Sequence, residues 1–482
     1  MAAFHAPVDR ADVSFRRNCH QASNRKDGLM EWMKQMLYHS FVLDARDSYQ
    51  GTMKFFEELV DEHMRITAEN KVSESSIKSR LEVHVPSVGI FYTPLPMSAA
   101  FQVYDTKYFI SKRRFITPSI NEIRHVLNLA QVMAIGPNLE LITFDGDQTL
   151  YSDGGNFENN DELAIGIMSL LCHGVKVAVV TAAGYGNDGS KYAKRLRGLL
   201  ERFIAEDLTQ QQIENMYVFG GECNYLLQCT VEMSVSRENA GGIPGESRTA
   251  VIRPVHFSLW QAEHLSGPKP AFWPLEQVET ILDVAERSMR ATVSELHLRV
   301  KVLRKERAVG VYPGGAEMAG SVPVGHGSLK IKREALDELV LRVVEELQTH
   351  EPRITLPYCV FNGGTDAWLD VGNKSVGVAV LQAYLKVPPA NCLHVGDQFS
   401  NTGNDIAARE TCPCIWIINP RETGKVLQHV VKYGGINLLQ SINISQRSRR
   451  PTEDITDIAA GVVPGQLKAS TSASRSNSST EL

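Results

Sequence analysis

Residues 139–149, LELITFDGDQT, join a mostly apolar run to the motif Asp-x-Asp-x-Thr. The run Leu139–Phe144 predicts a short strand, because it has the length and the apolar content of a buried strand. Such a strand delivers Asp145 at its C-terminal end. Ligands bind beyond the carboxyl ends of the strands in open α/β sheets, so this position makes Asp145 a candidate active-site residue.

The segments that follow complete a strand–helix–strand unit. Asp161–Cys172 has the pattern of a helix, and Val175–Val180 predicts a second strand that ends at Thr181. Within one sheet, this order implies two parallel strands joined by a right-handed crossover. Asp145 and Thr181 are therefore expected at the same edge of the sheet.

Two later motifs are expected at the same edge of the sheet. Lys374 opens a predicted helix, and the predicted strand Cys392–Val395 is followed by Gly396 and Asp397. From Thr181 to Lys374 there are 374 − 181 = 193 residues, which is too many for a loop in a compact domain. We therefore expect this segment to fold as an inserted domain.

The whole chain is predicted to be an α/β protein with a parallel, Rossmann-like sheet core, a large inserted α+β domain and an N-terminal helical region. The expected divisions are a helical region at 1–130, a core at 131–185 and 374–440, the insertion at 186–373, and a polar, disordered tail at 441–482. Ser119 and Glu122 predict a capping box at the start of a helix. Other expected helices lie at 29–66, 190–205, 275–308 and 330–348, and other expected strands at 216–219, 251–259 and 354–361.

Composition narrows the class of protein. The chain has 482 residues, of which 43% are hydrophobic and 22% charged, as in ordinary globular proteins of two or three domains. A net charge of −5 argues against sequence-independent binding of nucleic acid. No apolar run reaches the roughly 18 to 20 residues that a membrane span needs. The eight cysteines have no metal-site spacing, so we expect reduced thiols and a cytoplasmic protein.

Asp145 and Asp147 are candidates for covalent phosphoryl transfer. A carboxylate at Asp145 can attack phosphorus and form an aspartyl-phosphate, which divides one difficult displacement into two easier ones. Asp147 lies two residues further on, a spacing that lets both carboxylates reach one reaction centre. In the aspartate-nucleophile phosphatases that this pattern resembles, the second aspartate is the general acid and base. On its own, Asp-Gly-Asp is equally typical of a simple turn. The three companion motifs favour the catalytic interpretation.

The remaining motif residues are of the types that bind a phosphate group and a metal ion. The carboxylates of Asp145 and Asp397 and the backbone carbonyl of Asp147 form a set of hard oxygen ligands suited to Mg²⁺. Lys374 supplies a fixed cation and Thr181 a hydroxyl donor for the phosphate oxygens. There is an alternative for each residue. Lys374 could be a solvated residue in the first turn of a helix, and Thr181 could be an ordinary strand residue.

Asp405 stands eight residues beyond Asp397 and has three open interpretations. It can bind the metal through water, hold Lys374, or cap a helix that begins near Ile406.

Two glycine-containing loops are candidates for substrate selection. Phe219–Tyr225 and Phe361–Asp366 expose backbone groups that could hydrogen-bond a base and a ribose, while Tyr225 or Trp368 stacks on the base. The alternative is that both loops are tight turns between strands.

The order Asp-x-Asp-x-Thr, Thr, Lys and Gly-Asp resembles the haloacid dehalogenase superfamily of aspartate-nucleophile phosphatases. A closer resemblance, over about residues 29 to 440, is to the IMP-specific 5′-nucleotidases of fungi and protozoan parasites. It is carried by FDGDQTLYSDGG at 144–155, TAAGYGNDGSK at 181–191, FGGECNYL at 219–226 and GDQFSNTGNDIAAR at 396–409. The resemblance implies a haloacid-dehalogenase-like core whose insertion is a cap over the active site.

The resemblance also implies a function. The substrate would be inosine 5′-monophosphate (IMP), the cofactor Mg²⁺, and the assembly a homotetramer that ATP activates through the N-terminal helical region. The residues in contact with the nucleotide would be Asp147, Asp153, Thr181, Asp366 and Lys374. For the effector, our candidate is the basic cluster Lys112, Arg113 and Arg114, although such a run is usually a solvated face.

Two other functions fit parts of the pattern. A phosphomannomutase or sugar phosphatase would use the same two aspartates, and release of phosphate from IMP distinguishes it from a nucleotidase. A non-catalytic nucleotide sensor would retain the fold, but it would be expected to have lost one of Asp145, Asp147, Lys374 or Asp397.

Overall fold

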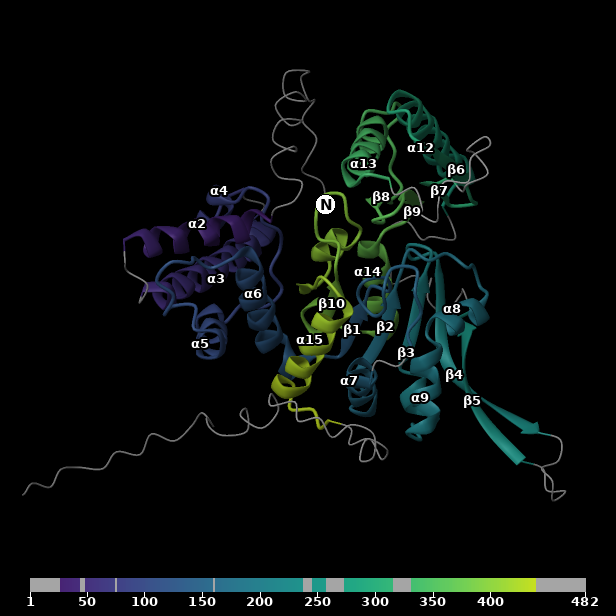
Figure 1. Cartoon of the computed structure of the whole chain (residues 1–482), viewed down its shortest axis with the longest axis horizontal. Coiled ribbons are helices and arrows are strands. Elements are labelled where there is room, and N and C mark those ends of the chain that lie inside the picture. Colours follow the sequence, from purple (N-terminus) through teal and green to yellow (C-terminus); the bar gives the residue numbers. More distant parts are fainter. Residues whose placement is uncertain are drawn as a thin grey trace, which may run out of the picture. The chain divides into compact units, whose positions relative to one another are not determined.

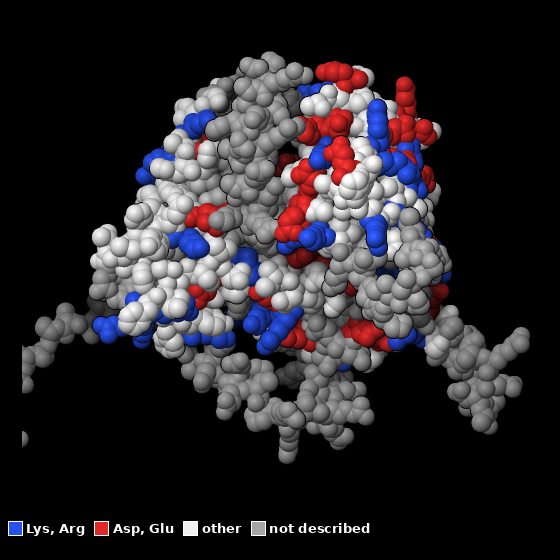
Figure 2. All heavy atoms as spheres, turned by 45° about the horizontal axis from the view of Figure 1, so that its top comes forward, with Lys and Arg blue, Asp and Glu red and all other residues white. Residues whose placement is uncertain are grey.

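The protein is described by a computed structural model that covers residues 27–43, 48–73, 76–158, 161–236, 245–256, 273–314 and 331–438 (Figure 1). The tail predicted at 441–482 lies outside these residues. Among the helices in this part of the chain, none has both the length and the apolar character needed to cross a membrane. On the face drawn in Figure 2, acidic and basic side chains are interspersed over the described surface.

The core is a seven-stranded sheet in the order β11-β10-β1-β2-β3-β4-β5. The first five strands in this order run parallel, and β4 and β5 are antiparallel to their neighbours. Leu141 of β1 pairs with Cys392 of β10 on one side and with Lys176 of β2 on the other. The strands are β1 (Leu141–Phe144), β2 (Lys176–Val180), β3 (Met216–Gly220), β4 (Tyr225–Ser236), β5 (Gly245–Pro254), β10 (Cys392–Gly396) and β11 (Cys414–Trp416).

Both faces of the central strands are covered, so every residue of β1 is buried. Ile142 and Phe144 point into an apolar layer shared with α7 (Asp161–Cys172) and α15 (Pro420–Tyr433). Leu141 points to the opposite layer, which contains residues of α14 (Lys374–Leu385). Parallel strands with both faces covered are continuously apolar, which explains why the run before Asp145 could be identified from sequence.

A second sheet has four antiparallel strands in the order β6-β7-β9-β8. It packs against α12 (Leu275–Glu295) and α13 (Arg333–Gln348), and together they enclose a separate apolar core. The strands are β6 (Val300–Arg304), β7 (Ala308–Pro313), β8 (Tyr358–Asn362) and β9 (Ala367–Val371). The helix expected at 275–308 is therefore corrected. It ends at Glu295, and the alternating residues Val300 and Val302 begin a strand.

The expected division at residue 186 also needs a correction. We assigned residues 186–373 to the inserted domain, but β3, β4 and β5 belong to the core sheet. β3 pairs in parallel with β2, and the β4–β5 hairpin continues the same sheet and runs beyond it (Figure 1). Between β2 and β3 lie α8 (Gly189–Arg195), α9 (Arg197–Ala205) and α10 (Gln210–Ile213), which is the length of an ordinary crossover.

The N-terminal region is helical, as expected, and has its own apolar core. It contains α2 (Gly28–Val42), α3 (Tyr49–Ser73), α4 (Arg80–His84), α5 (Met97–Tyr108) and α6 (Ile120–Ile135). The helix expected at 29–66 is thus two helices, α2 and α3. The capping box at Ser119 and Glu122 is confirmed, with both reciprocal hydrogen bonds present at the start of α6.

Candidate active site

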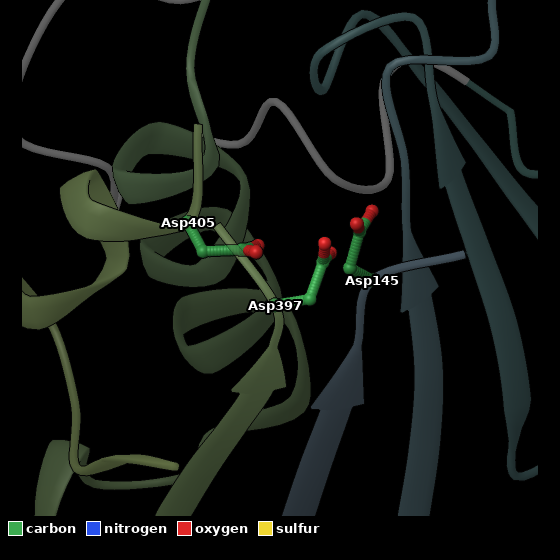
Figure 3. A group of neighbouring side chains, drawn as sticks. All are labelled: Asp145, Asp397 and Asp405. Atoms are coloured by element: carbon green, nitrogen blue, oxygen red, sulfur yellow. The ribbon is translucent and has the colours of Figure 1, made fainter. Parts of the chain in front are cut away.

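Three carboxylates meet at the carboxyl ends of β1 and β10 (Figure 3). Asp145 directly follows β1 and Asp397 follows β10, while Asp405 begins a short 3-10 helix, η6 (Asp405–Glu410). One ligand oxygen from each of the three lies within 4.8 Å of the others. The two motifs are 252 residues apart in sequence (397 − 145), and the parallel register of β1 and β10 brings them together.

Lys374 lies between two of these carboxylates. Its Nζ is 2.8 Å from Oδ1 of Asp145 and 2.6 Å from Oδ1 of Asp405, and its side chain is fully buried. Lys374 is the first residue of α14, and the side chain of Asn373 caps this helix by accepting from the backbone N–H of Val376. The cap fixes the start of the helix, and with it the position of the ammonium group. A solvated lysine is therefore excluded.

Asp405 contacts Lys374, as one of its three interpretations requires. Its Oδ1 is also 3.0 Å from Nε2 of His394, and its Oδ2 accepts from the backbone N–H of Gln398 at 2.8 Å. The side chain does not cap a helix, since Asn404 occupies the cap position. A side chain on Gly396 would overlap the carboxyl group of Asp405, so the Gly of the Gly-Asp motif permits this close approach.

The electrostatics of this cluster favour an added cation. Burial raises the pKa of Asp145 to about 7, although Lys374 opposes the shift. Burial and the charges of Asp145 and Asp405 raise the pKa of Asp397 to about 9. Burial also acts against ionisation of Asp405, but Lys374 and His394 hold its pKa below the ordinary value. The positive charge of one buried lysine thus faces three carboxyl groups, and a bound cation would favour their ionised forms.

The donor set fits a divalent metal ion. Oδ1 of Asp397 is buried and has no hydrogen-bond partner, which is costly unless a further group binds it. Carboxylate oxygens are the ligands that Mg²⁺ takes in proteins. Asp145 and Asp397, two of the three residues predicted to hold the ion, are therefore placed where they could bind it, and Asp405 lies in the same cluster.

Thr181 lies beside the first motif. It follows β2, and a Cβ placed on Gly146 would lie 3.3 Å from its Oγ1. The hydroxyl group is buried and accepts from the backbone N–H of Ala183 at 3.1 Å, so its hydrogen remains available to donate. The hydroxyl group of Thr181 can therefore donate a hydrogen bond to a phosphate oxygen.

Asp147 lies outside the buried cluster, in a group of its own. Its Oδ1 accepts from the backbone N–H of Gly154 at 2.9 Å. Both of its oxygens also accept from Nη2 of Arg195, at 3.1 and 3.2 Å. Sequence reasoning did not select Arg195, because it is one of several basic residues along α8 and α9 and belongs to no motif. Only the fold brings it to Asp147.

Asp153 and Asp366 face the same region from two different segments. Asp153 is exposed, and Asp366 is half-buried in the loop between β8 and β9. Burial, followed by the charge of Asp366, raises the pKa of Asp153. Burial also raises the pKa of Asp366, and the charge of Asp147 contributes. The three carboxylates are therefore close enough to act on one another.

The two glycine loops differ in character. Glu222 and Cys223, in the loop between β3 and β4, adopt left-handed backbone angles, with φ of 47° and 71°. Glu222 is fully buried and accepts from Nδ2 of Asn404 at 2.7 Å, so this loop is fastened to the last motif. In the second sheet, the ring of Trp368 lies under Nζ of Lys305, at 4.3 Å from its centroid.

The basic cluster Lys112, Arg113 and Arg114, which is expected to bind an effector, is partly engaged in contacts within the chain. Arg113 forms an ion pair with Glu122 at 2.5 Å, and Nζ of Lys112 lies 5.1 Å from the ring centroid of Phe109. Lys112 and Arg114 are exposed.

Sequence comparison identifies relatives over most of the chain. The profile of the IMP-specific 5′-nucleotidase family matches residues 12–427. An IMP-specific 5′-nucleotidase of Plasmodium falciparum is 34% identical over 86% of this chain and 85% of its own length. One from Yarrowia lipolytica is 36% identical over 85% of this chain and 95% of its own length.

Solved structures agree with the sequence comparison. A mutant P. falciparum IMP-nucleotidase with bound IMP superposes with a TM-score of 0.71, at 34% identity, over 85% of this chain and 94% of that chain. The ATP-bound form of the P. falciparum protein superposes with a TM-score of 0.69, at 33% identity, over 89% of each chain.

Proposed function

The chain belongs to the IMP-specific 5′-nucleotidase family, whose members are phosphoric monoester hydrolases, and from that premise we propose that it hydrolyses IMP to inosine and phosphate through an aspartyl-phosphate. The observation that carries the proposal is the pairing of buried Lys374 with Asp145 at the end of β1. A carboxylate and a fixed cation at this edge are what covalent phosphoryl transfer requires.

In the first step, an oxygen of Asp145 attacks phosphorus and the bond from phosphorus to the 5′-oxygen breaks. Asp147, in its protonated form, gives its proton to that oxygen, so that inosine leaves as an alcohol. Burial raises the pKa of Asp147, which favours the protonated form. In the second step, Asp147 takes a proton from water, and the water oxygen attacks phosphorus to release phosphate and restore Asp145.

The phosphate oxygens need positive charge and hydrogen-bond donors throughout. Lys374 supplies the charge and Thr181 a donor, both from the ends of buried elements that hold them in place. The proposed ligands of Mg²⁺ are Asp145, Asp397 and the backbone carbonyl of Asp147. When bound, the ion would neutralise charge on the transferring phosphoryl group.

For the nucleoside, we assign contacts to Asp153 and Asp366. Support comes from the charge of Asp366, which raises the pKa of Asp153, and from the charge of Asp147, which raises the pKa of Asp366. Carboxylates accept hydrogen bonds from ribose hydroxyl groups and from the N–H group of a base. Trp368 and Tyr225 remain the proposed stacking residues.

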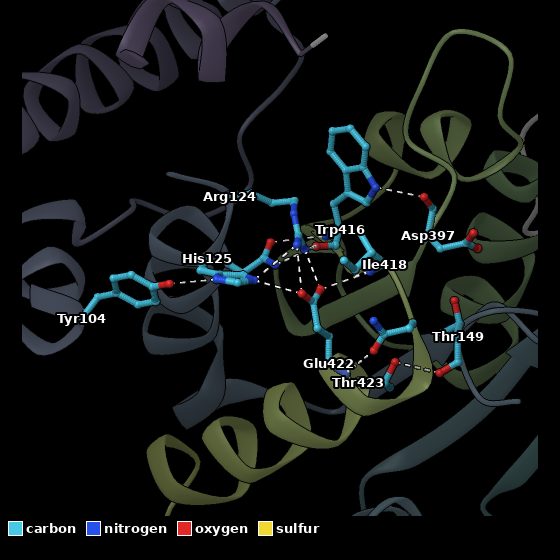
Figure 4. A network of polar contacts seen from close by, with 11 residues as sticks. Tyr104, Arg124, His125, Thr149, Asp397, Trp416, Ile418, Glu422 and Thr423 are labelled. Carbon is cyan, nitrogen blue, oxygen red and sulfur yellow. Dashed lines mark hydrogen bonds and ion pairs between the residues drawn. The ribbon is translucent and has the colours of Figure 1, made fainter. Parts of the chain in front are cut away.

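The ATP-bound form of the P. falciparum relative supports an ATP effect here too. We assign the effector to Lys112 and Arg114 and keep the homotetramer as part of the proposal. A chain of contacts supports coupling to the active site, and Figure 4 shows its part from Arg124 through Trp416 to Asp397. Arg113 pairs with Glu122 on α6, and Arg124 on the same helix donates to the backbone O of Trp416 at 2.6 Å. The indole N–H of Trp416 donates to the backbone O of Asp397 at 2.9 Å.

The decisive test is phosphate release with Mg²⁺ from IMP, GMP, AMP, mannose 1-phosphate and glucose 6-phosphate, with and without ATP. We expect IMP to be the best substrate and Asp145→Asn to be inactive. Faster release from sugar phosphates, or isomerisation of mannose 1-phosphate, would establish the sugar-phosphate alternative. Binding of IMP without turnover by the wild-type protein would establish the sensor.

A further inference from the structure

Arg195 touches the segment after the first aspartate at several points. It is the last residue of α8, and its side chain is 16% exposed. Nη2 donates to both carboxylate oxygens of Asp147, Nη1 donates to the backbone O of Gly155, and the guanidinium lies 5.0 Å from the ring centroid of Tyr151. Its own backbone O accepts from the N–H of Phe157 at 2.7 Å.

We propose that Arg195 is a positioning residue, which holds the carboxyl group of Asp147 and residues 151–157 in the arrangement that proton transfer needs. The inference rests on the proposed function, in which Asp147 is the general acid and base. It adds a residue that lies outside the four motifs and is joined to them only by the fold.

The geometry distinguishes this contact from an ordinary surface ion pair. One oxygen of Asp147 is fixed from two directions, by Nη2 of Arg195 and by the N–H of Gly154. Nη2 lies at similar distances from both oxygens and fixes the position of the carboxylate, while the N–H of Gly154 binds Oδ1 alone and so fixes the rotation of its plane. An ammonium group is more strongly hydrated and lacks the planar fork of a guanidinium, so lysine is expected to restore the charge but only part of the geometry.

Orientation matters here because Asp147 acts twice in one turnover. It must reach the 5′-oxygen of the nucleotide in the first step and a water molecule on the phosphorylated enzyme in the second. A carboxyl group that samples other rotamers is in reach for a smaller fraction of the time, and this lowers the rate without weakening substrate binding. Residues 151–157 would lose the bond from Nη1 to the backbone O of Gly155, but they would keep the backbone hydrogen bond from Phe157 to residue 195.

Arg195 also acts electrostatically on the carboxylates around it. Its charge lowers the pKa of Asp147 and of Asp153, against the burial that raises both. Arg195 thus faces the carboxylates assigned to proton transfer and to the nucleoside. It makes no contact with Asp145 or Lys374 in the bonds described, so its removal leaves the nucleophile and its cation intact.

The test compares Arg195→Met, Arg195→Lys and the control Arg197→Met, whose arginine is 75% exposed and pairs with Glu201 one turn along the helix. On IMP, we expect kcat to fall by about 10²-fold in Arg195→Met, the lower end of a general acid–base contribution, with KM within about twofold of wild type. Arg195→Lys should recover part of the loss, and Arg197→Met should match wild type.

A second substrate isolates the proton transfer. p-Nitrophenyl phosphate releases p-nitrophenolate, which needs no proton to depart, so the rate of the p-nitrophenolate burst in rapid mixing should be nearly unchanged in both Arg195 variants. In a double-mutant cycle on IMP, adding Arg195→Met to Asp147→Asn should lower kcat little further, because Arg195 acts through Asp147.

Three results would overturn the proposal. A raised KM for IMP with unchanged kcat would make Arg195 a substrate-binding residue. An equal loss on the IMP rate and on the p-nitrophenolate burst would place its effect on the nucleophile or the fold. Fully additive effects with Asp147→Asn would separate the two residues. If Arg195→Met fails to fold by circular dichroism, Arg195→Lys decides alone. Failure of wild type to hydrolyse IMP would instead refute the proposed function.

Discussion

Replacing Glu422 with glutamine should destabilise the protein strongly, because it breaks a buried ion pair between the N-terminal helices and the core. Oε2 of Glu422 lies 2.8 Å from Nη1 of Arg124, and Oε1 lies 3.0 Å from both Nη2 of Arg124 and Nε2 of His125 (Figure 4). The side chains of Arg124 and Glu422 are 2% and 16% exposed. The substitution leaves the guanidinium buried without its counterion.

The size of the effect follows from the pKa of Glu422. Burial by itself would raise it, but hydrogen bonds from His125 and Arg124 and the charge of Arg124 lower it from 4.5 to about 2. The difference, 4.5 − 2, is about 2.5, which at about 1.36 kcal/mol for each pKa unit amounts to about 3 kcal/mol. This agrees with the roughly 3 to 5 kcal/mol typical of breaking a buried pair.

The sign of the pH dependence is determined by the lowered pKa in the folded state. The stabilisation is fully present above pH 4.5 and is lost as the pH falls toward 2. The free energy of unfolding of Glu422→Gln should therefore be about 3 kcal/mol below wild type at pH 7, and the gap should narrow below pH 4.5.

Urea denaturation at pH 7, 5 and 3.5 measures this gap. The matched control is Glu69→Gln, which breaks the exposed i,i+4 pair with Arg65, whose side chains are 56% and 61% exposed. That change should cost no more than about 0.5 kcal/mol. The reasoning is refuted if Glu422→Gln costs no more than Glu69→Gln, or if its cost is the same at pH 3.5 as at pH 7.

The other predictions concern activity. Asp145→Asn should keep the fold but release no phosphate from IMP, whereas Asp147→Asn should lose about 10²- to 10⁴-fold in kcat, both measured by phosphate release beside circular dichroism. Removal of divalent metal with EDTA should abolish hydrolysis and added Mg²⁺ should restore it; full activity in EDTA would contradict the assigned ligands. Replacing Lys112 and Arg114 with alanine should leave the rate without ATP nearly unchanged and weaken activation, with a coupling energy on the scale of about 1 to 3 kcal/mol. An undiminished ATP response would move the effector site elsewhere. Arg113 is kept in that variant, because its loss would also break the pair with Glu122.

Local pattern was sufficient for the parts of the core that carry the chemistry. The apolar runs before Asp145, Thr181 and Asp397 have the continuous hydrophobicity of strands covered on both faces, so their type and order could be predicted. Because parallel strands end at one edge of a sheet, the order of the strands along the chain was sufficient to predict that these residues lie together. The capping box at Ser119 was equally local, since its two hydrogen bonds join residues three apart.

The tertiary structure decided what depends on distant partners. The sequence allowed three roles for Asp405, and only the structure shows its contact with Lys374, 31 residues earlier. It offered no reason to prefer Arg195 over its basic neighbours, because the contact with Asp147 spans 48 residues. β3, β4 and β5 lie in the stretch that spacing predicts as an insertion, and only their pairing places them in the core sheet. Ion pairs and strand pairing join residues that lie far apart in the sequence, and the local pattern of residues around each partner does not specify which two will meet.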